Sequence, residues 1–221
     1  MRILITAGPT REPIDPVRYI GNRSSGKMGA AIAAAALNMG HSVTVILGPV
    51  SVEYRQEARR VDVESTQQML AAVLSEFPRH DVLIMAAAVA DFRPVNASAA
   101  KLAREGKLLL ELEPTEDVVA AAGRIKRPDQ RTVGFSLESW PDLDRVRGKL
   151  REKNLDAVVY NPVGTIGSDA IEPAILYADG RVEWVGWESK LQFADMLIQR
   201  VAGLFQTARS VAFEACSSDK S

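Results

Sequence analysis

The sequence predicts an α/β protein with a doubly wound, mostly parallel, Rossmann-like sheet and a C-terminal antiparallel hairpin. Apolar runs of strand length alternate along the chain with segments whose apolar residues recur at helical spacing. The first three segments, Ile3–Ala7, Ala30–Asn38 and Ser42–Leu47, form a βαβ unit. Its two strands should therefore be parallel, with a right-handed crossover. Near the end, Asp179-Gly180 separates two short strands and predicts a type I′ hairpin.

The remaining elements continue this alternation. Ser65 is predicted to cap a helix that runs to about Phe77, because apolar residues there recur on one helical face. The continuous apolar run Asp81–Ala88 is predicted to be a strand buried on both faces. The other predicted segments are a strand Leu108–Leu112, a helix Asp117–Lys126, a strand Arg131–Leu137, a helix Asp142–Asn154, a strand Ala157–Tyr160, the hairpin strands Ala174–Ala178 and Arg181–Val185, and a final helix Glu188–Phe205.

Composition and charge favour a cytoplasmic, single-domain protein. The 221 residues carry a formal net charge of −1, so no strong global field favours nucleic acid or an acidic membrane surface. Cys216 is the single cysteine, which excludes a disulfide framework and fits a reducing compartment. No segment has the pattern of a secretory signal or a membrane span. We expect one domain over residues 1–206 and a polar, frayed C-terminal tail over residues 207–221.

The stretch Tyr19–Gly29, between the first strand and the first helix, is the leading candidate for ligand binding. A turn rich in glycine and hydroxyl groups exposes backbone N–H groups at the positive end of the following helix, which favours phosphate. An ordinary helix start, with a serine as N-cap, is the alternative. Neither the Walker pattern nor the dinucleotide fingerprint is present. The hydrogen-bond donors and the glycines that would permit close approach are Ser24, Ser25, Gly26, Lys27 and Gly29.

Three loops should meet at one edge of the sheet, because doubly wound sheets bind ligands beyond the carboxyl ends of their strands. These loops are Gly8–Gly29, Ala87–Lys107 and Phe135–Ser139. Within them, Asp91 could accept a hydrogen bond from a ribose or base, hold a metal, or simply form a turn. Asn22 could donate to an acyl oxygen or stabilise its own turn.

A long polar excursion, Phe92–Gly106, interrupts the alternation and is a candidate lid over this site. Lys101 and Arg104 on the excursion could join Lys27 in neutralising a polyphosphate. The alternative is a solvated basic loop, which the residues alone favour. The residues thus indicate an α/β protein that binds a phosphorylated or nucleotide ligand, and they leave open whether it performs chemistry.

Several segments carry a more specific signal. The long segment Ile5–Gly29, the segment Ala86–Arg93 and the run Lys149–Asp156 resemble the N-terminal signature, the AAVADYR-type segment and the K-x-x-x-K-N-L-D motif of one family. Val133–Phe135 together with Glu138 also fits. That family is phosphopantothenate–cysteine ligase, or phosphopantothenoylcysteine synthetase. In many bacteria its domain is the C-terminal half of a bifunctional coenzyme A biosynthesis flavoprotein.

The resemblance implies that 4′-phosphopantothenate is joined to L-cysteine with a nucleoside triphosphate and Mg²⁺. CTP is typical of bacterial members and ATP of eukaryotic ones. The carboxylate would attack the α-phosphate to give an acyl-nucleotidyl intermediate and pyrophosphate, and the cysteine amine would then displace CMP or AMP. The resemblance also implies a homodimer in which parts of each site are completed across the interface. The flavin-binding decarboxylase half is not in this sequence, so no flavin is expected.

The resemblance also implies roles for individual residues. Asn22 would orient or stabilise the acyl intermediate, Lys101 would contact the triphosphate and the reacting carboxylate, and the turn 24–27 would lie near phosphates. Metal ligands are not indicated. The residues expected around the nucleotide or substrate are Ala87, Ala88, Asp91, Glu116, Asp117, Val118, Val119, Phe135, Lys149 and Lys153.

Two departures from the family pattern keep alternatives open. The family's lid motif K-x-K-K is here Lys101-Leu-Ala-Arg104, and its N-P-D-I-V segment is here Thr115–Val119, without the proline. The choice between CTP and ATP therefore stays open. One alternative is a related nucleotide-dependent ligase for another phosphorylated acid. Another is a non-catalytic protein that binds a nucleotide or a pantothenate metabolite, although retention of Asn22 and Lys101 argues against it.

Overall fold

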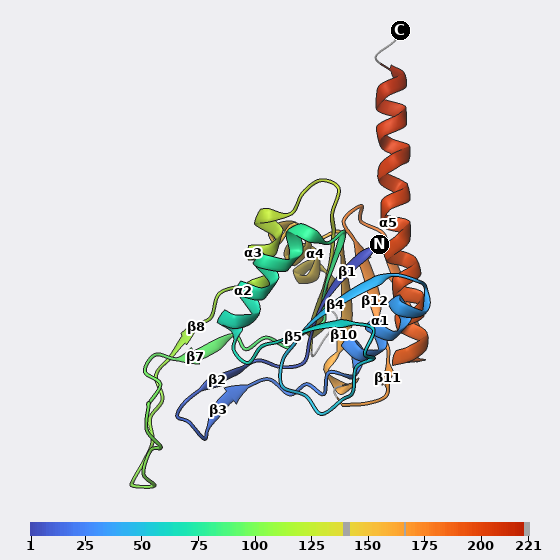
Figure 1. Ribbon diagram of the computed structural model, residues 1–221. Helices are drawn as coiled ribbons and strands as arrows, with labels where there is room; N and C mark the ends of the chain where they lie inside the picture. Colours follow the sequence, from blue (N-terminus) through green and yellow to red (C-terminus); the bar gives the residue numbers. More distant parts are fainter. Residues whose placement is uncertain (139–141, 166, 219–221) are drawn as a thin grey trace.

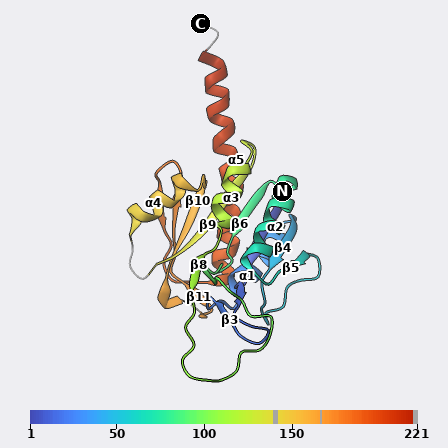
Figure 2. The same ribbon diagram turned by 90° about the vertical axis from the view of Figure 1, so that its left-hand side faces the viewer.

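The computed structural model describes residues 1–138, 142–165 and 167–218, and its centre is one eight-stranded sheet with helices on both faces (Figures 1 and 2). The strands are β1 (Arg2–Ala7), β4 (Ser42–Leu47), β5 (Arg59–Asp62), β6 (Val82–Met85), β9 (Arg131–Glu138), β10 (Ala157–Pro162), β12 (Ala174–Tyr177) and β13 (Val182–Trp184). Their order is β13-β12-β10-β9-β6-β1-β4-β5. The six strands from β10 to β5 are parallel, and β12 and β13 are antiparallel. The predicted fold class is confirmed.

Both faces of the sheet are covered, which explains why its central strands are continuous apolar runs. In β1, Ile3 and Ile5 pack into the cluster formed with α1 and α5, whereas Leu4 packs into the cluster formed with α2 and α3. A third cluster joins α4 to β10 and β12. The helices are α1 (Lys27–Asn38), α2 (Thr66–Glu76), α3 (Val118–Ile125), α4 (Leu143–Glu152) and α5 (Lys190–Ser218).

Helix starts follow capping chemistry at three places. Ser65 caps α2 with a full capping box, as predicted, and the side chains of Asp117 and Asp142 accept hydrogen bonds at the starts of α3 and α4. Helix α5 continues to Ser218 (Figure 1). Residues 207–218 are therefore helical, whereas the sequence had suggested a frayed tail. Within the described residues no helix, α5 included, combines the length and apolar character needed to cross a bilayer.

Several predicted boundaries were wrong. The run Asp81–Ala88 leaves the sheet after Met85, and Ala88 retains a single bridge to Pro9. In place of a strand at 108–112, the excursion returns as β8 (Leu112–Pro114), which pairs with β7 (Phe92–Pro94). Three further pieces were not predicted: the edge strand β5, the hairpin of β2 (Arg11–Pro13) and β3 (Tyr19–Gly21), and the pair β11 (Ala170–Ile171) and β14 (Glu188–Ser189).

The C-terminal hairpin forms as predicted, but its turn is of another type. A type I′ turn needs positive φ at both central residues. Gly180 has φ 92°, whereas Asp179 does not have positive φ. The N–H of Gly180 donates to the carbonyl oxygen of Tyr177 at 3.0 Å. Residues 177–180 therefore form a turn that ends in a left-handed glycine, and the loop is longer than two residues.

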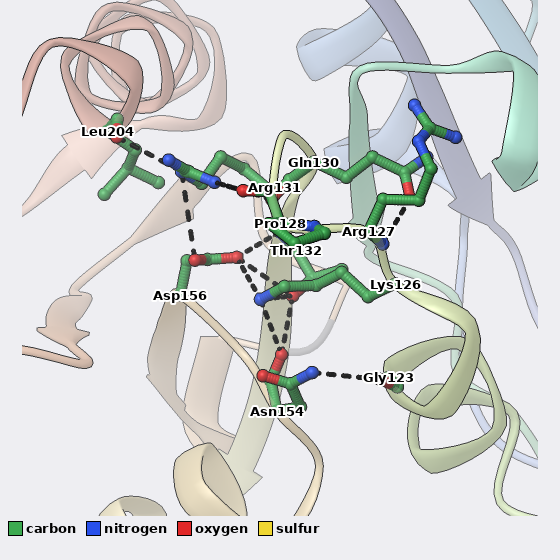
Figure 3. A network of polar contacts seen from close by, with 10 residues as sticks. All are labelled: Gly123, Lys126, Arg127, Pro128, Gln130, Arg131, Thr132, Asn154, Asp156 and Leu204. Atoms are coloured by element: carbon green, nitrogen blue, oxygen red, sulfur yellow. Dashed lines mark hydrogen bonds and ion pairs between the residues drawn. The ribbon is translucent and has the colours of Figure 1, made fainter. Parts of the chain in front are cut away.

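A polar network holds the amino ends of β9 and β10, at the end of the sheet opposite the carboxyl ends of its parallel strands (Figure 3). Lys126 Nζ lies 2.7 Å from Asp156 Oδ2 and also donates to the carbonyl oxygen of Asn154 at 2.9 Å. The same Asp156 oxygen accepts from the N–H of Thr132 at 2.7 Å. Asn154 has positive φ, 51°, and its amide donates to the carbonyl oxygen of Gly123. The network thereby ties α3 to the end of α4, just after Lys153.

The β7–β8 loop, residues 95–111, is anchored by one buried carboxylate. Asp15 is 3% exposed and accepts from the N–H groups of Val17 and Arg18, both at 2.8 Å, and of Leu102 at 3.2 Å. Burial alone would raise the pKa of Asp15, but these hydrogen bonds and the Arg18 guanidinium outweigh it, so the pKa lies below its ordinary value of 3.8. Asp15 therefore fixes the loop to the turn that follows β2.

This anchor predicts that acid opens the loop. A carboxyl with a lowered pKa in the fold stabilises it above the ordinary value, and that stability is lost as pH falls through the folded pKa. Below about pH 4, the loop amides that this anchor holds, such as that of Leu102, should lose protection from hydrogen exchange relative to pH 7, more than the amides of β1 do. Asp15→Asn should show fast exchange in this loop already at pH 7. Equal protection of the loop in the variant and the parent protein would contradict this role.

Candidate functional site

Two adjoining cavities lie at the carboxyl ends of β1, β6 and β9, where the strand order reverses. The larger measures about 660 Å³ and the smaller about 160 Å³, and they share Ala87, Ala88 and Phe135. The predicted residues that line the larger cavity alone are Asn22, Asp91, Glu116, Asp117, Val118, Val119, Lys149 and Lys153. Those that line the smaller cavity alone are Ser24, Ser25, Gly26, Lys27 and Gly29. The structure therefore brings together residues from five separate segments of the chain.

Lys101 and Arg104 are exceptions among the predicted residues, because both lie in the β7–β8 loop and neither lines a cavity. That loop extends away from the sheet beside the β2–β3 hairpin (Figures 1 and 2). Ser139, at the end of the predicted loop Phe135–Ser139, lies outside the described residues.

The turn before α1 has the geometry of an open helix start. Gly26 is the N-cap with φ 76°, and among the residues that the structure describes no side chain caps the helix, so the alternative of a serine N-cap was wrong. Ser24 and Ser25 accept only long hydrogen bonds, 3.4 Å, from the N–H groups of Gly26 and Lys27. Because nothing in the described part of the chain firmly satisfies these N–H groups, they remain available to an anion at the positive end of α1.

Tyr54 holds this turn, although it lies between β4 and β5 and was not among the residues predicted for the site. Its hydroxyl donates to the carbonyl oxygen of Gly26 at 2.9 Å, and burial raises its pKa, so the group stays a neutral donor. Gly29 packs so closely on β1 that an added Cβ would lie 2.3 Å from the Cβ of Ala7. The turn is thus set by packing and by one hydrogen bond.

Asn22 links two of the three loops. Its Nδ2 donates to the carbonyl oxygen of Val89 at 2.7 Å, and the side chain makes no other hydrogen bond within the described part of the chain. One N–H and the amide oxygen are therefore left for a ligand in the larger cavity.

Both lysines of the larger cavity are paired with carboxylates. Lys149 Nζ lies 2.6 Å from Glu138 Oε1, and Lys153 Nζ lies 2.8 Å from Asp117 Oδ2. Burial would raise the pKa of Glu138 and of Asp117. The hydrogen bonds and charges of these lysines, together with hydrogen bonds from the Ser136 hydroxyl to Glu138 and from the N–H of Ala120 to Asp117, outweigh burial, so the pKa of each carboxyl is lowered. The site therefore alternates cations and ionised carboxylates, which suits a ligand with both charged and polar parts.

A comparison with known families shows to which family the chain belongs. The model of the DNA/pantothenate metabolism flavoprotein C-terminal domain matches residues 1–204. The chain belongs to this family. The resemblance predicted from the sequence is confirmed, since the same domain forms the C-terminal part of the bifunctional coenzyme A biosynthesis protein CoaBC.

Curated relatives of this flavoprotein C-terminal domain are longer than the chain. CoaBC of Bacillus subtilis (strain 168) is 39% identical over 208 residues, which cover 91% of this chain and 51% of that protein. CoaBC of Vibrio cholerae is 42% identical over 169 residues, which cover 75% of this chain and 42% of that protein. A protein named cysteine/cysteine sulfinic acid decarboxylase, from an unknown prokaryotic organism, is 39% identical over 209 residues, covering 92% and 58%. The chain thus spans about half the length of these relatives.

Solved structures agree with the family assignment. The crystal structure of the C-terminal domain of CoaBC superposes with a TM-score of 0.81 at 36% identity, covering 93% of this chain and 96% of that one. A Cab2 mutant in complex with phosphopantothenate-cysteine has a TM-score of 0.78 at 18% identity, covering 96% and 88%, and shows the shared fold.

Among the residues at the cavities that sequence reasoning about this flavoprotein C-terminal domain missed are three polar side chains from late in the chain. Lys190 and Asn161 line the smaller cavity, and Asp169 forms an ion pair with Lys27. All three come from the segment after β9, where no pattern in the sequence pointed to ligand binding. In the part of the chain that the structure describes, no group of three or more His, Cys, Asp or Glu side chains is placed to hold a metal ion.

Proposed function

We propose that this domain joins 4′-phosphopantothenate to L-cysteine in coenzyme A biosynthesis, with CTP as the favoured nucleotide over ATP. The supporting observation is the convergence of Asn22, the open turn before α1 and the paired lysines on two connected cavities at the strand-order switch point. Family membership and the coenzyme A biosynthesis proteins among its relatives support the pathway. The fold shared with the Cab2 complex of phosphopantothenate-cysteine is consistent with this product. These substrates indicate a cytoplasmic enzyme.

The reaction divides into two displacements. The carboxylate of 4′-phosphopantothenate attacks the α-phosphate of the nucleotide and pyrophosphate leaves. The cysteine amine then attacks the acyl carbon, loses a proton and displaces the nucleoside monophosphate. Asn22 donates its free N–H to the acyl oxygen, where negative charge develops in the second step. The N–H groups at the start of α1 and the cationic side chains stabilise phosphate charge in the first.

Two carboxylates fit the Mg²⁺ that the reaction would need. A triphosphate usually brings Mg²⁺ to a protein with only one or two carboxylate ligands. Asp91 and Glu116 both line the larger cavity, and their carboxylates form no ion pair or hydrogen bond with the described residues. These two side chains would hold the ion, which would neutralise phosphate charge when bound. No flavin site is proposed for this domain.

The position of Lys101 favours a homodimer. The resemblance assigns this lysine to the nucleotide, yet it lies outside both cavities of its own chain. The β7–β8 loop that carries it also exposes a run of leucines, with Leu109 90% exposed. Exposed apolar runs of this kind mark interaction surfaces. A second copy that packs on this loop would cover the leucines and bring Lys101 to the neighbouring site.

The homodimer predicts a monomerising variant. Leu109→Glu should convert the dimer to a monomer and lower the turnover number at least tenfold, because a buried carboxylate at the interface is costly. Leu191→Glu, at another exposed leucine on α5, should leave the dimer intact. Sedimentation velocity measures both. A wild-type protein that sediments as a monomer at micromolar concentration would sink the dimer proposal.

Pyrophosphate release tests the function directly. The purified protein is mixed with Mg²⁺, 4′-phosphopantothenate and either CTP or ATP, with and without L-cysteine. Sustained release only with cysteine, and with CTP in preference to ATP, is expected. No release with either nucleotide, from protein shown to be folded, would favour a ligase for another phosphorylated acid or a binding role.

A further inference from the structure

The smaller cavity has a charge pattern that sets it apart from the larger one. Its charged lining residues are Arg23, Lys27 and Lys190, and no carboxylate is found among the described residues that line it. The larger cavity, in contrast, is lined by both acids and bases, including Asp91, Glu116, Lys149 and Lys153. A small cavity whose charged lining residues are all cations favours a compact anion.

Lys190 is held at this cavity by a short antiparallel pair. Strand β11 pairs with β14, directly before Lys190, and the backbone N–H of Lys190 donates to the carbonyl oxygen of Asp169 at 2.9 Å. The Lys190 ammonium donates to the carbonyl oxygen of Ser168, and among the described residues it has no carboxylate in ion-pair contact. The backbone therefore fixes a lysine whose charge is only partly compensated.

The electrostatic surroundings of Lys190 agree with a positive charge that is only partly compensated. Burial lowers its pKa, and the nearby charge of Lys27 lowers it further, against the weaker opposite effect of Asp169. An anion that bound between the two lysines would oppose the effect of Lys27 on this pKa, since it would compensate two charges that now repel each other.

Asp169 supplies a partial substitute for such an anion. Its Oδ1 lies 2.6 Å from Lys27 Nζ, but its side chain is 88% exposed and does not line the cavity. An exposed ion pair of this kind contributes little to stability, so the carboxylate can move away at small cost. Asp169 thus occupies Lys27 in the absence of ligand without blocking the cavity.

We propose that Lys27 and Lys190 together bind one phosphate group in the smaller cavity, and that Asp169 is an internal carboxylate which the phosphate displaces from Lys27. The inference rests on the proposed function for the identity of the ligand. The phosphate has two possible sources: the 4′-phosphate of phosphopantothenate, or a phosphate of the nucleotide. Either would gain charge-assisted hydrogen bonds from two ammonium groups.

Calorimetric binding to the full chain tests this site with three probes: 4′-phosphopantothenate, pantothenate and CTP. Lys190→Gln should lower the affinity for the probe whose phosphate occupies the site by about tenfold to a hundredfold. Lys190→Arg should retain most of that affinity. Asp169→Asn should raise the affinity for the same probe about threefold or more, because a carboxylate that competes with the phosphate for Lys27 is removed. Pantothenate, which has no phosphate, should be unaffected by all three variants. Asp195→Asn, on the exposed face of α5, is the matched control.

The opposite signs of the two main variants separate a binding role from structural damage, since damage would not tighten binding. If the affinity changes for phosphopantothenate alone, the bound phosphate is that of the substrate. If it changes for CTP alone, the bound phosphate is that of the nucleotide. Unchanged affinity for both probes in Lys190→Gln, or weaker binding in Asp169→Asn, would overturn the inference. If pyrophosphate release persists with unchanged KM values in Lys190→Gln, the inference fails while the ligase function stands. If the wild type releases no pyrophosphate, but the variants change the binding affinity as expected, the ligase function fails and the phosphate site stands.

Discussion

Replacing Asn22 by Asp is expected to lower the turnover number by about a hundredfold or more while nucleotide affinity changes little. The amide of Asn22 donates one N–H to the carbonyl oxygen of Val89 at 2.7 Å and has a second N–H free in the larger cavity. An aspartate has no N–H at this position, and its negative charge would face the acyl oxygen at which negative charge develops. The second half-reaction should therefore be slowed more than the first.

Rapid-quench measurement of pyrophosphate separates the two steps. Asn22→Asp should release about one equivalent of pyrophosphate per site and then stall, with the acyl-nucleotidyl intermediate bound. Gln199→Glu makes the same change of charge on an exposed position of α5 and should behave as wild type. Turnover close to wild type in Asn22→Asp would remove this residue from the mechanism. Loss of the first burst as well would mean that the broken contact with Val89 disturbs the loop.

The elements that sequence reasoning placed well are those whose burial is uniform. β1 and β4 are covered on both faces, and their apolar runs carry that information directly. β5, at the edge of the sheet, reads Arg-Arg-Val-Asp and is largely exposed, so no apolar pattern marks it. The β2–β3 hairpin was hidden for a related reason. Its buried residue is Glu12, whose carboxylate accepts from the N–H of Thr66 at the start of α2.

The candidate site shows a similar division. The rule that ligands bind at the carboxyl ends of parallel strands was enough to bring Asn22, Asp91 and Phe135 to one place. It could not locate Lys190, because that lysine reaches the cavity through the β11–β14 pair, whose strands are two residues each. Nor could it place Lys101, because the course of a long polar loop depends on tertiary contacts such as those of Asp15.

The close packing of α1 on β1 leads to the largest expected effect on stability, that of Gly29→Ala. The new Cβ would lie 2.3 Å from the Cβ of Ala7 and 3.0 Å from the hydroxyl of Tyr54, so the helix must move away from the strand. Overpacking of this severity costs about 2–3 kcal/mol, and alanine's better helix propensity offsets only about 1 kcal/mol of strain. We expect a net loss measurable as a lower urea midpoint, with an unchanged slope.

Gly148→Ala provides the matched control, because Gly148 lies within α4 and an added Cβ there would meet only Glu152, at 3.9 Å. This variant should be stabilised by about 0.5–1 kcal/mol, so the same substitution should have opposite signs in the two helices. If Gly29→Ala were also stabilising, α1 would not be held against β1 as the packing indicates. Because the Tyr54 hydroxyl would meet the new Cβ and also donates to the carbonyl oxygen of Gly26, a displaced α1 should also misplace the N–H groups of the turn. Gly29→Ala should therefore weaken binding of the phosphate ligand in conditions where the protein remains fully folded, whereas Gly148→Ala should not.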